Sequence, residues 1–158
     1  MAKKRQSQRR AGILPNQKVE IDFVLLGDFA QASNGKLTVV GAGWNIWNTP
    51  KYPNDLPFGL GIGFLVPWNE TNRKHKFTFK IAASEGDTLV EGGGEFEIGR
   101  KTGIPPGMIQ RVVIGLSGQL KIESSGTYEI LVTCAGQRKT VTFEALPVQL
   151  PQLSVGQQ

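Results

Sequence analysis

The sequence has little cysteine and histidine and no long apolar segment. Its 158 residues include one cysteine, Cys134, and one histidine, His75. An internal disulfide and a zinc site made of several Cys and His ligands are therefore excluded. The apolar runs are too short to cross a bilayer, and the charged N-terminus lacks the apolar segment of a secretory signal peptide. We expect a cytoplasmic protein without membrane insertion, metal or cofactor.

Signals for catalysis are equally scarce. The glycine-rich segments lack the Gly-Lys-Ser/Thr order of a phosphate-binding loop and lie in strand-like sequence, whereas such loops precede a helix. Carboxylates on one strand face, such as Glu95 and Glu97, are typical of a solvated surface. Cys134 alternates with apolar residues and has no adjacent basic residue, which predicts a buried, unreactive thiol. We therefore expect no catalytic residues and a protein that is not an enzyme.

The positive charge of the chain is concentrated at its N-terminus. The formal net charge of +5 comes from 18 basic and 13 acidic residues. The first ten residues contain no acid and five of the basic residues, so the remainder has 13 of each sign. A flexible basic segment of this kind is typical of phosphate contact, although it is also typical of a solubilising terminus. The candidate anion-binding or nucleic-acid-binding residues are Lys3, Lys4, Arg5, Arg9 and Arg10.

Residues 18–147 show the pattern of a β domain. Short segments of alternating apolar and polar residues recur between turn-forming residues, and no amphipathic helix is evident. The pair Asn34-Gly35 predicts a tight hairpin. The pattern predicts an all-β, antiparallel, immunoglobulin-like β-sandwich of about eight strands, preceded by a disordered basic arm (1–17) and followed by a tail (148–158). The predicted strands are 19–30, 36–47, 58–66, 74–83, 88–99, 110–122, 127–135 and 138–146.

Two of these strands have distinctive faces. Val19, Ile21 and Phe23 alternate with acids, which predicts that all three point into the core. In the strand 58–66, three glycines alternate with Leu60, Ile62 and Phe64, so one face has no side chains. A bare face lets a ring or another backbone lie against it, and we expect Trp44 or Trp47 to fill that space.

Four blocks of sequence carry a resemblance to a known family. They are "FVLLGDFAQASNGKLTVVGAGW", "VPWNETNRKHKFTFKI", "FEIGRKTGIPPGMIQRVVIGL" and "SSGTYEILVTCAGQ". Together they resemble an uncharacterised bacterial family over about residues 20–145, in the same order. The resemblance implies a single sandwich similar to immunoglobulin or fibronectin type III domains. It implies no activity or catalytic residue, and the basic arm lies outside it.

Two further stretches contain candidate sites. In "WNIWNTPKYPND", the aromatic residues Trp44, Trp47 and Tyr52 lie among asparagines, a composition typical of a platform for sugars or other small ligands. Core packing of the same rings is the favoured interpretation. In "VPWNETNRKHKF", His75 is in phase with apolar residues, which predicts a rim position with one ring nitrogen bonded to a backbone group or water. The basic pairs 100–101 and 138–139 would extend the positive surface that contacts an anionic partner only if folding gathers them.

These features favour a non-catalytic interaction or structural module. We expect the sandwich to dock to a protein partner or to copies of itself within a larger assembly, with the arm contacting an anionic partner. Basic arms on β-sandwiches occur in such assemblies, including virions, but that is an analogy of architecture. The alternatives are a nucleic-acid-binding protein that uses the arm and a ligand-binding or carbohydrate-binding domain that uses Trp44, Trp47 and Tyr52.

Overall fold

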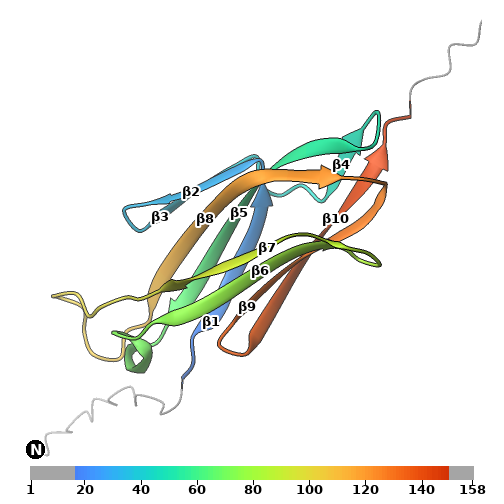
Figure 1. Ribbon diagram of the computed structural model, residues 1–158. Helices are drawn as coiled ribbons and strands as arrows, with labels where there is room; N and C mark the ends of the chain where they lie inside the picture. Colours follow the sequence, from blue (N-terminus) through green and yellow to red (C-terminus); the bar gives the residue numbers. More distant parts are fainter. Residues whose placement is uncertain (1–16, 150–158) are drawn as a thin grey trace, which may run out of the picture.

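The computed structural model describes residues 17–149, which form an all-β domain (Figure 1). The predictions for the basic arm and for all but the first two residues of the tail lie outside these residues. The described part contains ten strands and one turn of 3-10 helix, and none of its helices is long and apolar enough to span a membrane. The elements are β1 (Glu20–Gly27), β2 (Phe29–Ser33), β3 (Lys36–Val40), β4 (Ile46–Thr49), β5 (Asn54–Val66), η1 (Trp68–Glu70), β6 (His75–Ala83), β7 (Thr88–Phe96), β8 (Gln110–Ile122), β9 (Gly126–Cys134) and β10 (Gln137–Pro147).

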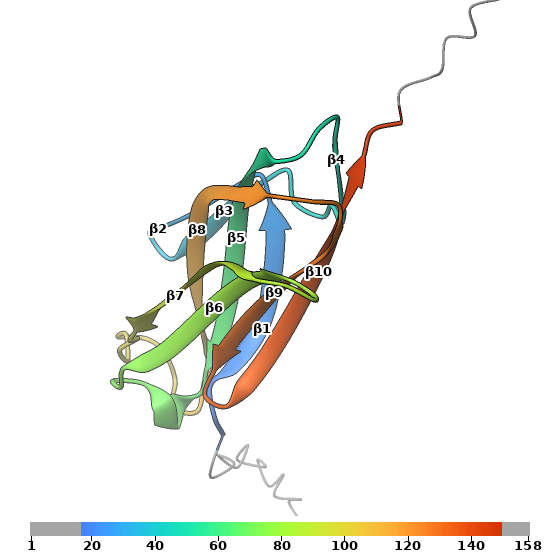
Figure 2. The ribbon, with the colours of Figure 1, turned by 45° about the vertical axis from the view of Figure 1, so that its right-hand side comes forward.

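The strands form two main sheets and a separate hairpin (Figure 2). One sheet has the order β1-β5-β8, the other has the order β4-β10-β9-β6-β7, and β2 pairs only with β3. Every pair is antiparallel except β4 with β10, which is parallel. The all-β prediction is confirmed. The strand number exceeds the predicted eight because the first two predicted strands each divide in two, near Asp28 and at residues 41–45.

The core lies between the two main sheets. Leu60, Ile62 and Phe64 of β5 are fully buried and meet apolar side chains of the five-stranded sheet, among them Ile130 and Val132 of β9. The Phe64 ring lies 4.5 Å from that of Phe96, measured between ring centres. Fully burying one such side chain contributes about 1.5–3 kcal/mol, so this strip is a principal source of the domain's stability.

The β2–β3 hairpin covers the outer face of β5. A Cβ atom at Gly59 would collide with the backbone at Phe29 and Ala30, and one at Gly61 would lie 2.8 Å from side chains of Leu37 and Val39. The predicted close approach of another backbone to the glycine face is therefore confirmed. The prediction that Trp44 or Trp47 fills this space is wrong, because the β2–β3 hairpin, which turns at Asn34-Gly35, is long enough to fold back over the sheet.

The predicted orientation of Phe23 is also wrong. The pairing of β1 with β5 shifts register between Ile21 and Phe23, as in a β-bulge. The extra residue turns Phe23 to the outer face, where its ring lies against Gly63, and brings Val24 into the core. Simple alternation cannot reveal a bulge, because the residues on both sides of it are apolar.

Candidate functional site

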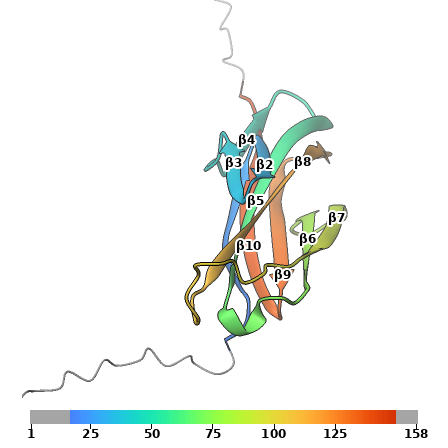
Figure 3. The same ribbon diagram turned by 90° about the vertical axis from the view of Figure 1, so that its left-hand side faces the viewer.

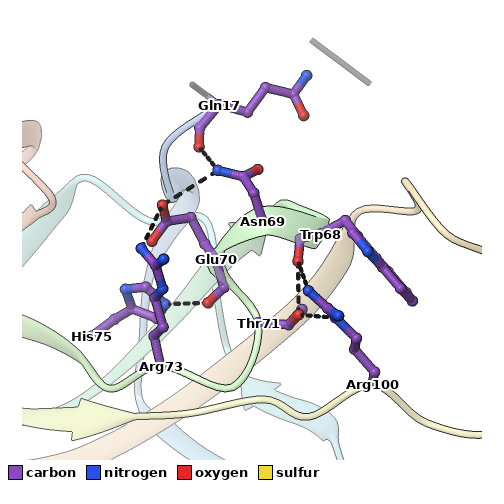
Figure 4. A network of polar contacts seen from close by, with 8 residues as sticks. All are labelled: Gln17, Trp68, Asn69, Glu70, Thr71, Arg73, His75 and Arg100. Carbon is purple, nitrogen blue, oxygen red and sulfur yellow. Dashed lines mark hydrogen bonds and ion pairs between the residues drawn. The ribbon is translucent and has the colours of Figure 1, made fainter. Parts of the chain in front are cut away.

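One end of the sandwich, which we call the arm end, is where residue 17 leads into β1. It lies at the bottom of the view in Figure 1 and contains η1, the start of β6, the loop 97–109 and the turn between β9 and β10. Asn69 Nδ2 donates a hydrogen bond of 2.9 Å to the backbone carbonyl of Gln17 (Figure 4). The corner at η1 therefore fixes the point from which the preceding residues leave the domain.

Arg100 is held rigidly at this corner (Figure 4). Its Nε donates to Thr71 Oγ1 at 2.9 Å, and its Nη2 donates to the carbonyl of Trp68 at 3.3 Å. The guanidinium carbon lies 4.5 Å from the centre of the Trp68 ring, which is the geometry of a cation–π contact. Thr71 is buried and donates its own hydroxyl proton to the Trp68 carbonyl at 2.7 Å. The arrangement fixes a positive charge at the surface.

The only histidine has a structural position beside this corner. His75 Nε2 lies 2.7 Å from the carbonyl of Glu70, and because a carbonyl only accepts, the ring nitrogen donates. The half-buried ring lies 5.5 Å from that of Phe96 between centres. The predicted rim position, with one ring nitrogen bonded to the backbone, is confirmed. The stretch that holds His75 is a corner of the sheet whose polar groups bond to one another.

The turn between β9 and β10 joins the same end of the molecule. Gln137 Oε1 accepts a hydrogen bond of 3.1 Å from the backbone nitrogen of Ile21, and Lys139 Nζ donates one of 2.8 Å to the carbonyl of Asp22. These contacts place the turn against the start of β1. Both basic pairs, 100–101 and 138–139, thus lie at the arm end, one in the loop 97–109 and the other at the start of β10.

The charges of the folded body are unevenly distributed between the arm end and the rest of the body. Residues 17–149 have 13 basic and 13 acidic side chains and are neutral in sum. Register and contacts place nine of the basic and five of the acidic residues at the arm end, which leaves it at +4 and the rest of the body at −4. The basic residues are Lys18, Arg73, Lys74, Lys76, Arg100, Lys101, Arg111, Arg138 and Lys139. The acids there are Glu20, Asp22, Glu70, Glu95 and Glu97.

Three of these acids form ion pairs with basic residues of the arm end, and one of the three pairs is short. Asp22 accepts two bonds from Arg111, at 2.8 and 2.7 Å. The pairs Arg73–Glu70 and Lys76–Glu95 are looser, at 3.7 and 3.9 Å, and solvent screens them. Within residues 17–149, the exposed side chains of Lys74, Lys101 and Arg138 make no ion pair. Their charges are available to an anionic partner, and they lie beside the root of an arm with five further basic residues.

The predicted aromatic platform lies near the opposite end. Trp44 meets Phe143 edge-on, with ring centres 5.6 Å apart, and donates from Nε1 to Asp28 at 3.1 Å. Trp47, on β4, and Tyr52 are half-buried and pack against the core. The structure therefore brings the three residues to one region, with each ring engaged by the core. Ligand binding there remains a prediction.

The single thiol is part of the core, as predicted. Cys134 is 3% exposed and lies on the same strand face as Ile130 and Val132. Burial raises its pKa above the ordinary value for a thiol. The thiol is thus protonated at neutral pH and shielded from reagents, and it does not belong to the arm end's surface.

The sequence alone did not reveal the Arg100–Trp68 contact or the anchoring of Gln17 by Asn69. The first joins residues 32 apart and the second joins residues 52 apart in the chain. No periodic pattern relates such positions. The one available signal was the basic pair 100–101 beside a turn, and its relevance depended on where the fold placed that turn.

Comparison with known families gives a match over most of the chain. A family model with the description "Family of unknown function (DUF6941)" matches residues 22–143. The chain belongs to this family. The matched residues include the η1 corner, Arg100 and the β9–β10 turn, but not the basic arm. A search among curated proteins gave no match. The predicted membership of an uncharacterised family is confirmed, and no activity comes with it.

Proposed function

We propose that this protein is a non-catalytic interaction module whose arm and arm end hold an anionic partner. In this proposal the sandwich docks to protein partners or to copies of itself in a larger assembly. The observation that supports it is the charge segregation of a neutral body, with the +4 end at the root of the basic arm. The immunoglobulin-like or fibronectin-like character of the sandwich and a cytoplasmic location are parts of the same proposal.

Nucleic acid is the anionic partner that this arrangement favours. The arm has five basic side chains within ten residues, enough to follow several successive phosphates. At its root, Lys101 and Arg138 continue the positive surface from two different loops. Arg100 is stacked on Trp68 and hydrogen-bonded within the domain, so its charge is already oriented and loses little conformational freedom on binding. Such contacts provide affinity without base specificity.

The experiment compares charge reversals at the two ends of the body. One full-length variant carries Lys101→Glu and Arg138→Glu at the arm end, and the other carries Lys51→Glu and Lys121→Glu away from it. All four side chains are exposed, so both variants should fold, and their net charges are equal. Each is titrated into labelled single-stranded and duplex DNA and RNA over a range of salt concentrations.

The proposal requires a difference between these matched variants. The arm-end variant should bind more weakly, and for duplex DNA the slope of log K against log salt should fall by about two phosphate contacts, at about 0.9 per contact. The Lys51/Lys121 variant should change much less. Equal losses in both variants would indicate a response to net charge alone and would contradict a site at the arm end.

A further inference from the structure

The strand β7 leaves one edge of the five-stranded sheet open. β7 is the last strand in the order β4-β10-β9-β6-β7, and within residues 17–149 no strand pairs with its other side (Figure 3). The five residues from Glu91 to Glu95 are all exposed. An edge of this length offers unpaired backbone N–H and C=O groups to another extended segment.

Glycines make the middle of this edge accessible. A Cβ atom at Gly92 would lie 2.9 Å from the Phe79 ring, and one at Gly94 would lie 3.1 Å from the Phe77 ring. These glycines therefore allow the two rings of β6 to lie close under β7. They also leave no side chains between Glu91 and Glu95 that would obstruct an incoming strand.

The acids on β7 specify the charge of such a strand. Lys80 is the register partner of Glu91, and Lys76 is that of Glu95, so the two acids lie on one face with two basic residues on the β6 side. On the open side, a new strand would place side chains about 4.5–5.5 Å from the acids, at positions four residues apart. Acids at an edge repel acidic strands, so this edge selects a strand with basic residues at i and i+4.

The protein's own arm has this spacing. Arg5 and Arg9 are four residues apart, with Gln6, Ser7 and Gln8 between them, in the sequence "RQSQR". In an extended strand, alternate residues share a face, so Arg5 and Arg9 would lie opposite the two glutamates in either strand direction, with Ser7 opposite Gly93. The two glutamines would then lie on the glycine side. The segment contains no proline, which would remove a backbone donor.

The direction of the chain identifies which copy provides the arm. β7 runs toward the arm end, because Phe96 is paired with His75 there. An arm that docked on its own domain and led directly to Gln17 at the arm end would pair with β7 in parallel. Antiparallel pairing is the more stable arrangement per residue, and a second copy is free to adopt it. A reciprocal exchange would form two equivalent contacts in a symmetric dimer.

We propose that residues 5–9 of a second copy add to the open edge of β7 as an antiparallel strand. Arg5 then lies opposite Glu95, and Arg9 lies opposite Glu91. This inference goes beyond the proposed function, because it depends on which face of the arm carries the charge, whereas binding to an anionic polymer depends on total charge. The two uses of the arm compete, so nucleic acid would displace the exchanged arms.

The test compares full-length variants with the same net charge. Arg5→Glu/Arg9→Glu reverses the face that meets β7, and Lys4→Glu/Arg10→Glu reverses two arm charges on the opposite face. Sedimentation velocity of nucleic-acid-free protein over a concentration series measures self-association. The first variant should dimerise about tenfold or more weakly, since two favourable cross-strand pairs become repulsive. The second should dimerise like the parent. Adding Glu91→Arg/Glu95→Arg to the first variant should restore the dimer.

The other outcomes overturn the proposal. A parent protein that is monomeric at every concentration excludes arm exchange. Equal losses in the two arm variants show that general electrostatics drives association, and absence of rescue shows that β7 is not the receptor. If hydrogen exchange shows β7 amides protected in a monomer, and only Arg5→Glu/Arg9→Glu removes the protection, the occupant is the protein's own arm. Nucleic-acid binding is a separate readout, which should fall equally in both arm variants when it is measured at protein concentrations too low for the parent dimer to form.

Discussion

Replacing Arg100 with alanine tests how the arm end is stabilised. The change removes two hydrogen bonds from the guanidinium and its cation–π contact with Trp68. A hydrogen bond from a charged group contributes about 1.5–3 kcal/mol when buried, and a cation–π contact contributes about 0.5–1 kcal/mol at an exposed site. Because the Arg100 side chain is exposed to solvent, we take the lower parts of these ranges and count the weaker bond as negligible. The expected loss of unfolding free energy is about 2 kcal/mol.

Urea denaturation of the full-length protein measures this loss. Lys101→Ala is the matched control, because the neighbouring side chain is exposed and makes no ion pair within residues 17–149. It should change the unfolding free energy by less than about 0.5 kcal/mol. Arg100→Lys should fall between the two, since it keeps the charge but not the planar fork. A loss below about 0.5 kcal/mol in Arg100→Ala would refute the inference that the contacts of Arg100 with Thr71 and Trp68 stabilise the η1 corner.

Three further perturbations test the fold. Gly59→Val should lower the unfolding free energy in urea by more than about 3 kcal/mol, because the valine side chain would collide with the hairpin backbone at Phe29. An unchanged unfolding free energy would show that the β2–β3 hairpin can move away from β5. Trp47→Ala should cost about 2 kcal/mol, and an unchanged melting temperature would instead favour the ligand platform. Burial raises the pKa of Cys134, so the unfolded thiol ionises first and stability should fall as pH rises above about 8.5. Cys134→Ala should show a smaller loss between pH 7 and pH 10, and equal losses would contradict the burial argument.

The sequence predicted strands well where one face of a strand is buried and the other is solvated. On β9, Tyr128, Ile130, Val132 and Cys134 are all buried, as their alternation indicated. The hairpin at Asn34-Gly35 was equally predictable, since both residues adopt positive φ, at 50° and 70°. These features depend on local chemistry, which a single sequence contains.

The remaining features depend on distant contacts. The bulge between Ile21 and Phe23 reverses the faces of β1, and the alternation of apolar residues with acids around it does not indicate its position. β4 pairs in parallel with β10, almost a hundred residues later in the chain, so its partner could not be identified from turns. The charge of the arm end likewise arises from loops that only the topology brings together. The basic residues of the arm are visible in the sequence and their role stays a prediction, whereas the surface at the arm's root could not be predicted from the sequence.

The most direct test of the proposed function is a comparison of the full-length protein with a chain that begins at Val19. Each is titrated into labelled nucleic acid at about 0.15 M salt and at several other salt concentrations. We expect only the full-length protein to bind tightly, with a salt dependence that corresponds to at least four or five phosphate contacts from the arm. Absence of binding by both proteins at physiological salt, or equal binding by both, would contradict the proposal that the arm and the arm end hold an anionic partner.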